Sequence, residues 1–313
     1  MKIKFYGLLY LSEEDSAPVN VSVKDFRDKI AVYVKCAINL SNSLQSKNIA
    51  FTLLTNKKDV VEEIIQAEWK TLQVKEIPFS TKVPHGVKFY SAHFKLDAFR
   101  YLSSLSDDYV GLLDLDMVCI NAFPHCFSNN VKQKVPMCYD ISDQVIPAYG
   151  HEAIIRDLES IHCLESEGRW SGGEFISGSP EFFLTLTKEI DSIYDNYINN
   201  LEKLHHVGDE SITSAALEII RKKGTYIADA GTLGIVGRFW SVKILHPQKP
   251  FGYFQQCFLL HLPSDKRFLA DMASGKTMEL SEFTKSYDRY RNSSIIKFKN
   301  AIRRIVKMLA LLN

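Results

Sequence analysis

The 313-residue chain carries 38 Lys and Arg against 37 Asp and Glu, so its formal net charge is only +1. This balance excludes a broadly basic nucleic-acid-binding protein, and we expect no nucleic acid among its partners. A hydrophobic content of 46% and an aromatic content of 12% indicate a globular protein with a substantial core. No uninterrupted apolar stretch reaches the roughly 18 residues of a membrane span.

The six cysteines are scattered, without a C-x-x-C pair or a cysteine–histidine metal pattern. A disulfide framework is therefore not indicated, and we expect a reducing, cytoplasmic location. The length allows one large domain, or a domain of about 250 residues with an appendage.

The first half of the chain alternates strand-like and helix-like segments. We expect strands at 2–11, 49–54 and 72–77, helices at 28–45, 59–69 and 93–105, and an apolar strand that ends at Asp114. This alternation with short connections predicts an α/β fold with a mixed, mostly parallel sheet flanked by helices. Ligands of such sheets bind at the carboxyl ends of the strands.

The second half is less regular. Loops and short helices are expected at 123–171, a strand at 172–179, helices at 180–199 and 211–223, and a last apolar strand at 253–262. We find no internal repeat and no low-complexity linker. The simplest division is a catalytic domain at 1–268 followed by a basic helical extension at 269–313.

Two aspartates, Asp114 and Asp116, follow the apolar run that begins at Tyr109. On an extended backbone, residues two apart point to the same face. Burying both charges costs several kcal/mol each unless a cation compensates them, and hard oxygen ligands favour Mg²⁺ or Mn²⁺. The alternative is a strand end at which Asp114 caps a turn and Asp116 faces solvent.

His261 ends another apolar run, and Lys266 follows five residues later. A neutral imidazole is a suitable third ligand for Mn²⁺ beside two carboxylates, and the lysine would offset phosphate charge. Taken alone, a histidine in this position is more often a core or strand-end residue that has no ligand.

Two further segments carry polar or conformationally free residues. Gly172 and Gly173 would let the backbone approach a sugar or a pyrophosphate closely, or would form a bulge or tight turn. Asp209 and Glu210 stand at a predicted helix start, where acids are favoured by the helix dipole. Either Asp209 or Ser211 would cap that helix, or both acids point into one cleft.

In chain order these segments resemble the retaining GT-A-fold glycosyltransferases of family eight, which includes glycogenin and bacterial lipopolysaccharide galactosyl- and glucosyltransferases. The resemblance spans residues 1–268. Its strongest stretch is HFKLDAFRYLSSLSDDYVGLLDLDMVCI (93–120), which is similar to a basic-leucine helix followed by a YLDADxLV strand. RWSGGEFISG, GDESITSAAL and HLPSDK look like the FNSGV strand, the DQxxLN helix start and the HxxGxxKPW ending of that family.

The resemblance implies a role for each residue of these motifs. It assigns Asp114, Asp116 and His261 to a Mn²⁺ (or Mg²⁺) ion that bridges the phosphates of a nucleotide-sugar donor, most often UDP-linked. Lys95, Asp114, Asp140 and Lys266 would bind the donor, and Gly172 and Gly173 would let the backbone approach it. The first strand lacks the family's usual contacts to uracil, and Tyr10 or Ser12 would replace them. Asp209 would bond donor-sugar hydroxyls, and Glu210 would lie beneath the anomeric carbon.

The expected activity is retaining transfer of a hexose to a saccharide or lipid-linked saccharide acceptor in surface polysaccharide synthesis. Two alternatives stay open: an inverting GT-A enzyme in which Asp209 or Glu210 is the base, and a non-catalytic module of the same fold that binds glycans or partners.

The C-terminal segment 293–313 combines apolar and basic residues at helical spacing. Between Lys285 and the last residue there are eight Lys or Arg and a single acid, Asp288. This pattern fits an interfacial helix attracted to anionic lipid, which would place the enzyme peripherally at the cytoplasmic face of a membrane. It fits equally a helix docked on the catalytic domain with a solvated basic face.

Overall fold

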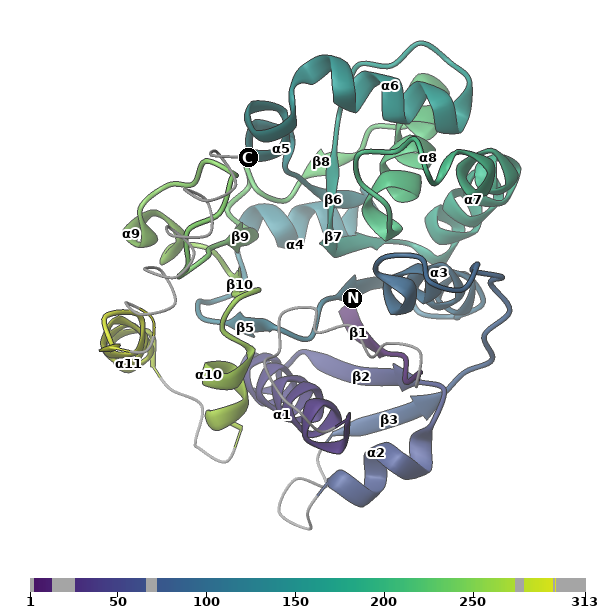
Figure 1. Ribbon diagram of the computed structural model, residues 1–313. Helices are drawn as coiled ribbons and strands as arrows, with labels where there is room; N and C mark the ends of the chain where they lie inside the picture. Colours follow the sequence, from purple (N-terminus) through teal and green to yellow (C-terminus); the bar gives the residue numbers. More distant parts are fainter. Residues whose placement is uncertain (1–2, 13–25, 66–71, 274–278, 295, 297–313) are drawn as a thin grey trace.

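A computed structural model describes residues 3–12, 26–65, 72–273, 279–294 and 296. Its centre is a seven-stranded sheet of order β3-β2-β1-β4-β7-β6-β8 (Figure 1). The strands are β1 (Ile3–Leu9), β2 (Ala50–Thr55), β3 (Gln73–Glu76), β4 (Tyr109–Leu113), β6 (Met137–Asp140), β7 (Ser171–Gly178) and β8 (Ala228–Asp229).

Most neighbours in this sheet are parallel. β3, β2, β1 and β4 form one parallel block, and β6 is parallel to β8. β7 lies between the two groups and runs antiparallel to both β4 and β6. The predicted mixed, mostly parallel sheet is therefore confirmed.

A second, three-stranded sheet positions the later part of the chain. It contains β5 (Met117–Cys119), β10 (Leu259–His261) and β9 (Val236–Arg238), with β10 in the middle. In its register His261 stands opposite both Met117 and Arg238. This pairing carries His261 to the start of β5, immediately beside the two aspartates.

Helices cover both faces of the sheet. They are α1 (Phe26–Gln45), α2 (Lys58–Ile64), the 3-10 helix η2 (Tyr90–Phe94), α3 (Lys95–Ser103), α4 (His125–Lys132), α5 (Ser142–Tyr149), α6 (His151–His162), α7 (Pro180–Asn200), α8 (Asp209–Lys222), α9 (Phe251–Phe254), α10 (Lys266–Asp271) and α11 (Leu280–Arg291). α1 packs against α10 and β5, and α7 packs against α3, α6 and α8.

Local sequence explains the sharpest of these boundaries. α7 begins where Ser179 accepts a hydrogen bond from the amide of Phe182 and Pro180 occupies the first turn, a favoured helix start. All five residues of β4 are buried, as expected for a strand that is covered on both faces.

Two expected segments differ from the structure. Instead of one strand at 253–262, α9 follows Pro250, and only Leu259–His261 is extended. An apolar, aromatic run suits a short buried helix as well as a strand, so its composition did not distinguish them. The segment 123–171, expected to lack strands, contributes β6, whose four residues are too few to show a periodicity.

α11 belongs to the part of the chain predicted to be an extension. Its Phe283 and Tyr287 join the main hydrophobic core, and Tyr287 donates a hydrogen bond to Asp265 at 2.7 Å. The predicted interfacial helix at 293–313 lies almost wholly outside the described residues, which there include only Ser293, Ser294 and Ile296. None of the described helices is both long and apolar enough to cross a membrane.

Candidate active site

Asp114 and Asp116 lie in the tight turn that joins β4 to β5. The amide of Asp114 donates to the carbonyl of Glu174 at 3.0 Å, and the carbonyl of Asp116 accepts from the amide of Leu262 at 3.0 Å. The two side chains therefore converge because the turn is fixed at both ends, rather than through the alternation of an extended strand. Asp116 is buried, so the alternative in which it faces solvent is wrong.

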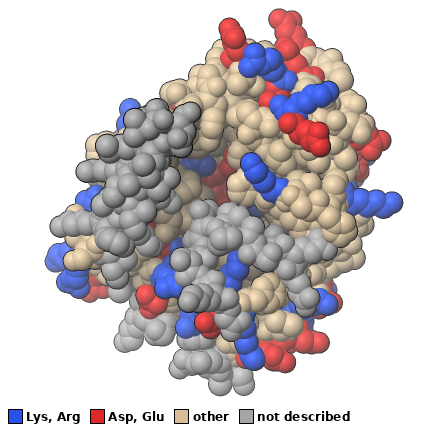
Figure 2. All heavy atoms as spheres, in the orientation of Figure 1, with Lys and Arg blue, Asp and Glu red and all other residues tan. Residues whose placement is uncertain are grey.

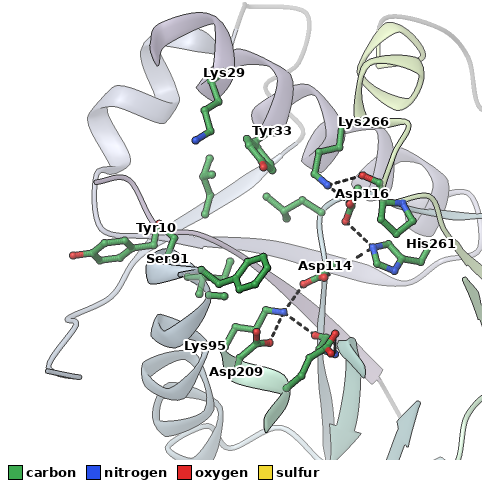
Figure 3. A pocket seen from close by; sticks show the side chains of 18 of the residues that line it. Tyr10, Lys29, Tyr33, Ser91, Lys95, Asp114, Asp116, Asp209, His261 and Lys266 are labelled. Carbon is green, nitrogen blue, oxygen red and sulfur yellow. Dashed lines mark hydrogen bonds and ion pairs between the residues drawn. The ribbon is translucent and has the colours of Figure 1, made fainter. Parts of the chain in front are cut away.

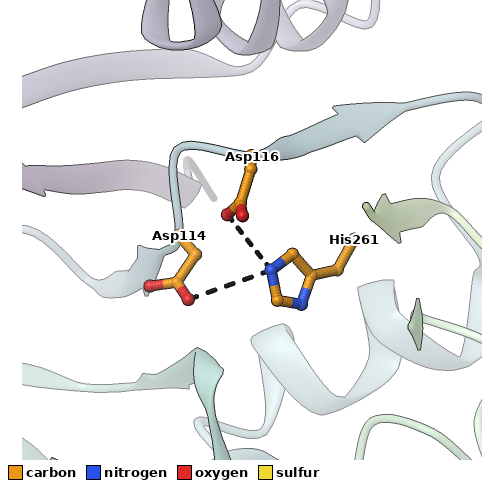
Figure 4. Close-up of side chains that lie close together, drawn as sticks. All are labelled: Asp114, Asp116 and His261. Atoms are coloured by element: carbon orange, nitrogen blue, oxygen red, sulfur yellow. Dashed lines mark hydrogen bonds and ion pairs between the residues drawn. The ribbon is translucent and has the colours of Figure 1, made fainter. Parts of the chain in front are cut away.

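His261 completes a compact group with the two aspartates (Figure 4). Its Nε2 lies 3.1 Å from Asp116 Oδ1 and 4.0 Å from Asp114 Oδ2, and one ligand atom from each residue lies within 4.8 Å of the others. Two carboxylates and an imidazole form a donor set suited to Mn²⁺ or Mg²⁺.

The charged side chains of this group shift one another's pKa values. Burial alone would lower the pKa of His261, but the Asp116 and Glu174 carboxylates outweigh it and raise the pKa to about 9. Burial would raise the pKa of Asp116, yet Lys266 and His261 hold it well below its usual range. Lys266 Nζ donates to Asp116 Oδ2. A bound cation would replace the proton on His261 and release Lys266 from Asp116.

Lys95 forms a second charged cluster beside the first (Figure 3). Its Nζ lies 2.7 Å from Asp114 Oδ1 and 2.8 Å from Asp209 Oδ2, and it donates to the carbonyl of Gly173 at 2.8 Å. Burial would lower the pKa of Lys95, but the two carboxylates outweigh it and raise the pKa. Lys95 thus links the group of Asp114, Asp116 and His261 to Asp209 at the start of α8.

No side chain caps the start of α8. Gly208, with φ of 145°, occupies the cap position, and neither Asp209 nor Ser211 provides a side-chain cap to the helix amides. Asp209 instead reaches Lys95. Glu210 Oε2 accepts from Trp170 Nε1 at 3.1 Å, and Glu210 Oε1 accepts from the amide of Gly173 at 3.3 Å. Both acids therefore lie on the same cleft.

These groups line one cavity of about 560 Å³, a volume typical of small-molecule sites. Tyr10, Lys95, Asp114, Asp116, Gly173, Asp209, Glu210, His261 and Lys266 are all in its wall. The face drawn in Figure 2 is hollowed near its centre, and acidic and basic atoms stand at the walls of the hollow.

Two predicted donor-binding residues lie outside the cavity wall. Asp140 accepts from the amide and hydroxyl of Ser142 at 2.9 and 2.6 Å, so its carboxylate serves the start of α5. A Cβ atom at Gly172 would overlap Glu174 Oε2. The absence of a side chain at this position therefore makes room for a buried carboxylate.

Sequence reasoning missed two buried charged residues of the site. Glu174 is 1% exposed in β7, and Arg238 is 4% exposed at the end of β9. The available signal was a charged residue inside each short apolar segment, which requires a partner when buried. It was missed because neither partner is near in sequence. The wall also includes Tyr33, His206 and Trp240, which no motif singled out.

The charged side chains that are linked by ion pairs around the two aspartates carry an excess of negative charge that one divalent cation would balance. Five carboxylates (Asp114, Asp116, Glu174, Asp209, Glu210) face three permanent cations (Lys95, Arg238, Lys266). Within these ion pairs of the described residues, the carboxylates exceed the permanent cations by two charges when His261 and His206 are neutral. One Mn²⁺ or Mg²⁺ would balance them, so both the donor atoms and the charge fit the predicted metal.

We expect Gly173→Ala to disrupt the Lys95 cluster. A Cβ atom there would collide with Asp209 Oδ2 and lie 2.9 Å from Lys95 Nζ. Overpacking of this kind costs about 1–3 kcal/mol, and binding of a ligand in the cavity should weaken with it. Urea denaturation measures the first effect. Gly252→Ala is the matched control, because nothing lies within 4 Å of a Cβ at that position; equal stability of the two variants would contradict the prediction.

The layered arrangement, with the paired acids at the carboxyl end of a strand of the parallel block, is that of a GT-A fold. A solved structure with this arrangement is the galactosyltransferase LgtC in complex with donor and acceptor sugar analogs. The likeness has a TM-score of 0.53 and 10% sequence identity, and covers 90% of this chain and 99% of that one. It confirms the predicted resemblance at the level of the fold.

No protein-family model matches the sequence, and no curated protein matches it. At 10% identity a shared fold does not carry an activity with it, so function has to be argued from the chemistry of the site.

Proposed function

We propose that the protein is a metal-dependent retaining glycosyltransferase that moves a hexose from a nucleotide sugar, UDP-linked by resemblance, onto a saccharide or lipid-linked saccharide. The observation that carries this proposal is the donor set of Asp114, Asp116 and His261 in the wall of a ligand-sized cavity. The cations around it would stabilise the anionic diphosphate of a nucleotide sugar. The carboxylates would stabilise the positive charge that develops on the sugar.

The chain's own residues have distinct roles in this proposal. Asp114, Asp116 and His261 would hold Mn²⁺ or Mg²⁺, which when bound supplies charge neutralisation to the diphosphate. Lys266, which is held by Asp116 and the carbonyl of Pro263, would turn to a phosphate oxygen. Its positive charge would stabilise the departing nucleoside diphosphate as that group takes both electrons of the anomeric bond.

On the sugar side, Asp209 would accept a hydrogen bond from a donor-sugar hydroxyl. Glu210 would face the anomeric carbon, which becomes positively charged as in glycoside hydrolysis. Its carboxylate is oriented by Trp170 and by the amide of Gly173. The acceptor hydroxyl would attack from the side of the leaving group, and its proton would pass to a phosphate oxygen.

Membrane association is also part of the proposal and rests on the sequence alone. Residues 297–313 lie outside the described residues, and their pattern of Arg and Lys among Ile, Val and Leu suits an anionic lipid surface. Attachment there would bring a cytoplasmic enzyme to a lipid-linked acceptor used in surface polysaccharide synthesis.

The test is a thermal-shift panel of nucleotide sugars with and without Mn²⁺. A donor at about a hundred times its Kd should stabilise the protein by about 2.7 kcal/mol, and the shift should require the metal. Incubation of the active pair with saccharide acceptors then shows transfer, and NMR of the product reports the anomeric configuration. Retention supports the proposal, whereas inversion would assign Asp209 or Glu210 as a base. Absence of any donor-induced shift would reject it.

A further inference from the structure

Glu174 is a buried carboxylate that the proposed reaction does not use directly. It lies in β7 between Gly173, which lines the cavity, and Phe175, which packs into the core, and its side chain is 1% exposed. A carboxylate at such a depth is costly unless it is paired. A buried ion pair is also weak evidence for stability, because well-packed apolar residues often serve as well. Its presence therefore calls for another explanation.

Glu174 contacts His261, one of the three proposed metal ligands. Glu174 Oε1 lies 3.2 Å from His261 Nδ1, the ring nitrogen that faces away from the aspartates. If Nδ1 carries the ring proton and donates a hydrogen bond to Glu174, then Nε2 keeps its lone pair, directed at Asp114 and Asp116. Histidine ligands are commonly fixed in this way by a carboxylate behind the ring.

Glu174 is itself held in place from the other side. Arg238 Nε lies 3.5 Å from Glu174 Oε1, and Arg238 donates to Gln144 Oε1 through Nε at 3.2 Å and Nη2 at 2.9 Å. The same bonds explain a low pKa: burial would raise the pKa of Glu174, but Arg238 and His261 lower it to about 2. Gly172 leaves the space that the carboxylate occupies.

We infer that Glu174 is a positioning residue for the metal centre, because its carboxylate, anchored by Arg238, sets the His261 ring with Nε2 toward the two aspartates. This inference rests on the metal site of the proposed function. It extends that function by adding a buried row of side chains, Gln144–Arg238–Glu174–His261, that ends at a proposed metal ligand. Arg238 also approaches Glu210 Oε1 at 3.9 Å, so the row passes close to the proposed reaction centre.

The test is titration of the full chain with Mn²⁺ alone, with the free ion followed by electron paramagnetic resonance. The wild-type protein should bind one ion. Glu174→Gln should weaken Mn²⁺ binding by about 10–100-fold, the usual loss when the partner behind a histidine ligand is removed. Glu174→Asp keeps the charge and should bind Mn²⁺ more tightly than Glu174→Gln. Arg238→Gln should lose less Mn²⁺ affinity than Glu174→Gln, because it removes only the anchor of the Glu174 carboxylate.

The matched control is Glu218→Gln. Glu218 is 2% exposed and lies 3.4 Å from His162 Nε2, so it too is a buried glutamate against a histidine. It is outside the cavity wall, and its variant should bind Mn²⁺ as the wild-type protein does even if it is less stable. Equal Mn²⁺ affinity of wild type and Glu174→Gln would overturn the inference while leaving the proposed function intact. A wild-type protein that binds no Mn²⁺ would overturn both.

Discussion

Asp116→Asn should abolish metal-dependent transfer. Asp116 is the residue that contacts both His261 and Lys266, so its loss removes a ligand and frees a lysine into the same site. A metal that stabilises a departing diphosphate contributes several kcal/mol to the transition state, and we expect kcat/KM to fall by at least about 10³-fold. The measurement is initial rate of transfer at saturating Mn²⁺.

The control for this variant is the response of its melting temperature to Mn²⁺. The ion should raise the melting temperature of the wild-type protein, because a ligand of the native state stabilises it. It should leave that of Asp116→Asn unchanged. Asp191→Asn, at an exposed aspartate paired with Arg100, should respond like wild type. Retention of both transfer and the Mn²⁺ response in Asp116→Asn would contradict the proposed site.

Lys95→Met should destabilise the fold far more than the same substitution at a surface lysine. The ammonium group of Lys95 is shared by Asp114 and Asp209, and its side chain is only 12% exposed. Removing it leaves two carboxylates close together without a cation, and removal of one partner from a buried pair typically costs about 3–5 kcal/mol. Urea denaturation should show this as a lower midpoint with an unchanged slope.

A second substitution identifies the cause. In Lys95→Met/Asp209→Asn one of the stranded charges is gone, so part of the lost stability should return. Lys58→Met provides the comparison at an exposed position, since the Lys58–Glu62 pair lies on the surface of α2 and such pairs contribute about 0.3–0.5 kcal/mol. A similar small change for Lys95→Met would show that the Lys95 cluster is not a buried charge pair.

The sequence was sufficient to predict the sheet and the convergence of the acids with His261. Apolar runs that end in charged residues mark the carboxyl ends of strands, which is how the position of the two aspartates could be predicted. His261 reaches them by a different route, through the antiparallel pairing of β10 with β5 in the second sheet. The side chains of Asp114, Asp116 and His261 lie together, as the motif resemblance implied. Lys95 and Asp209 reach the same cavity because α3 and α8 begin at its wall.

The remaining parts depended on contacts that no local pattern records. Glu174 and Arg238 are separated by 64 positions, and each looks like an isolated charge in an apolar segment. Asp140 fits a motif position but is used by Ser142 at a helix start. The final apolar run became a helix and a strand because the register of β10 against β5 and β9, not its composition, limits the extended part.

The place of β10 between β5 and β9 has a consequence for the order of events during synthesis. Asp116 and His261 are 145 positions apart, so closing that loop carries a large entropy cost that only late tertiary contacts offset. A nascent chain that has emerged from the ribosome only as far as α8 holds both aspartates but not the imidazole. If the proposed metal site is correct, tight binding of the ion should therefore begin only when the polypeptide is complete.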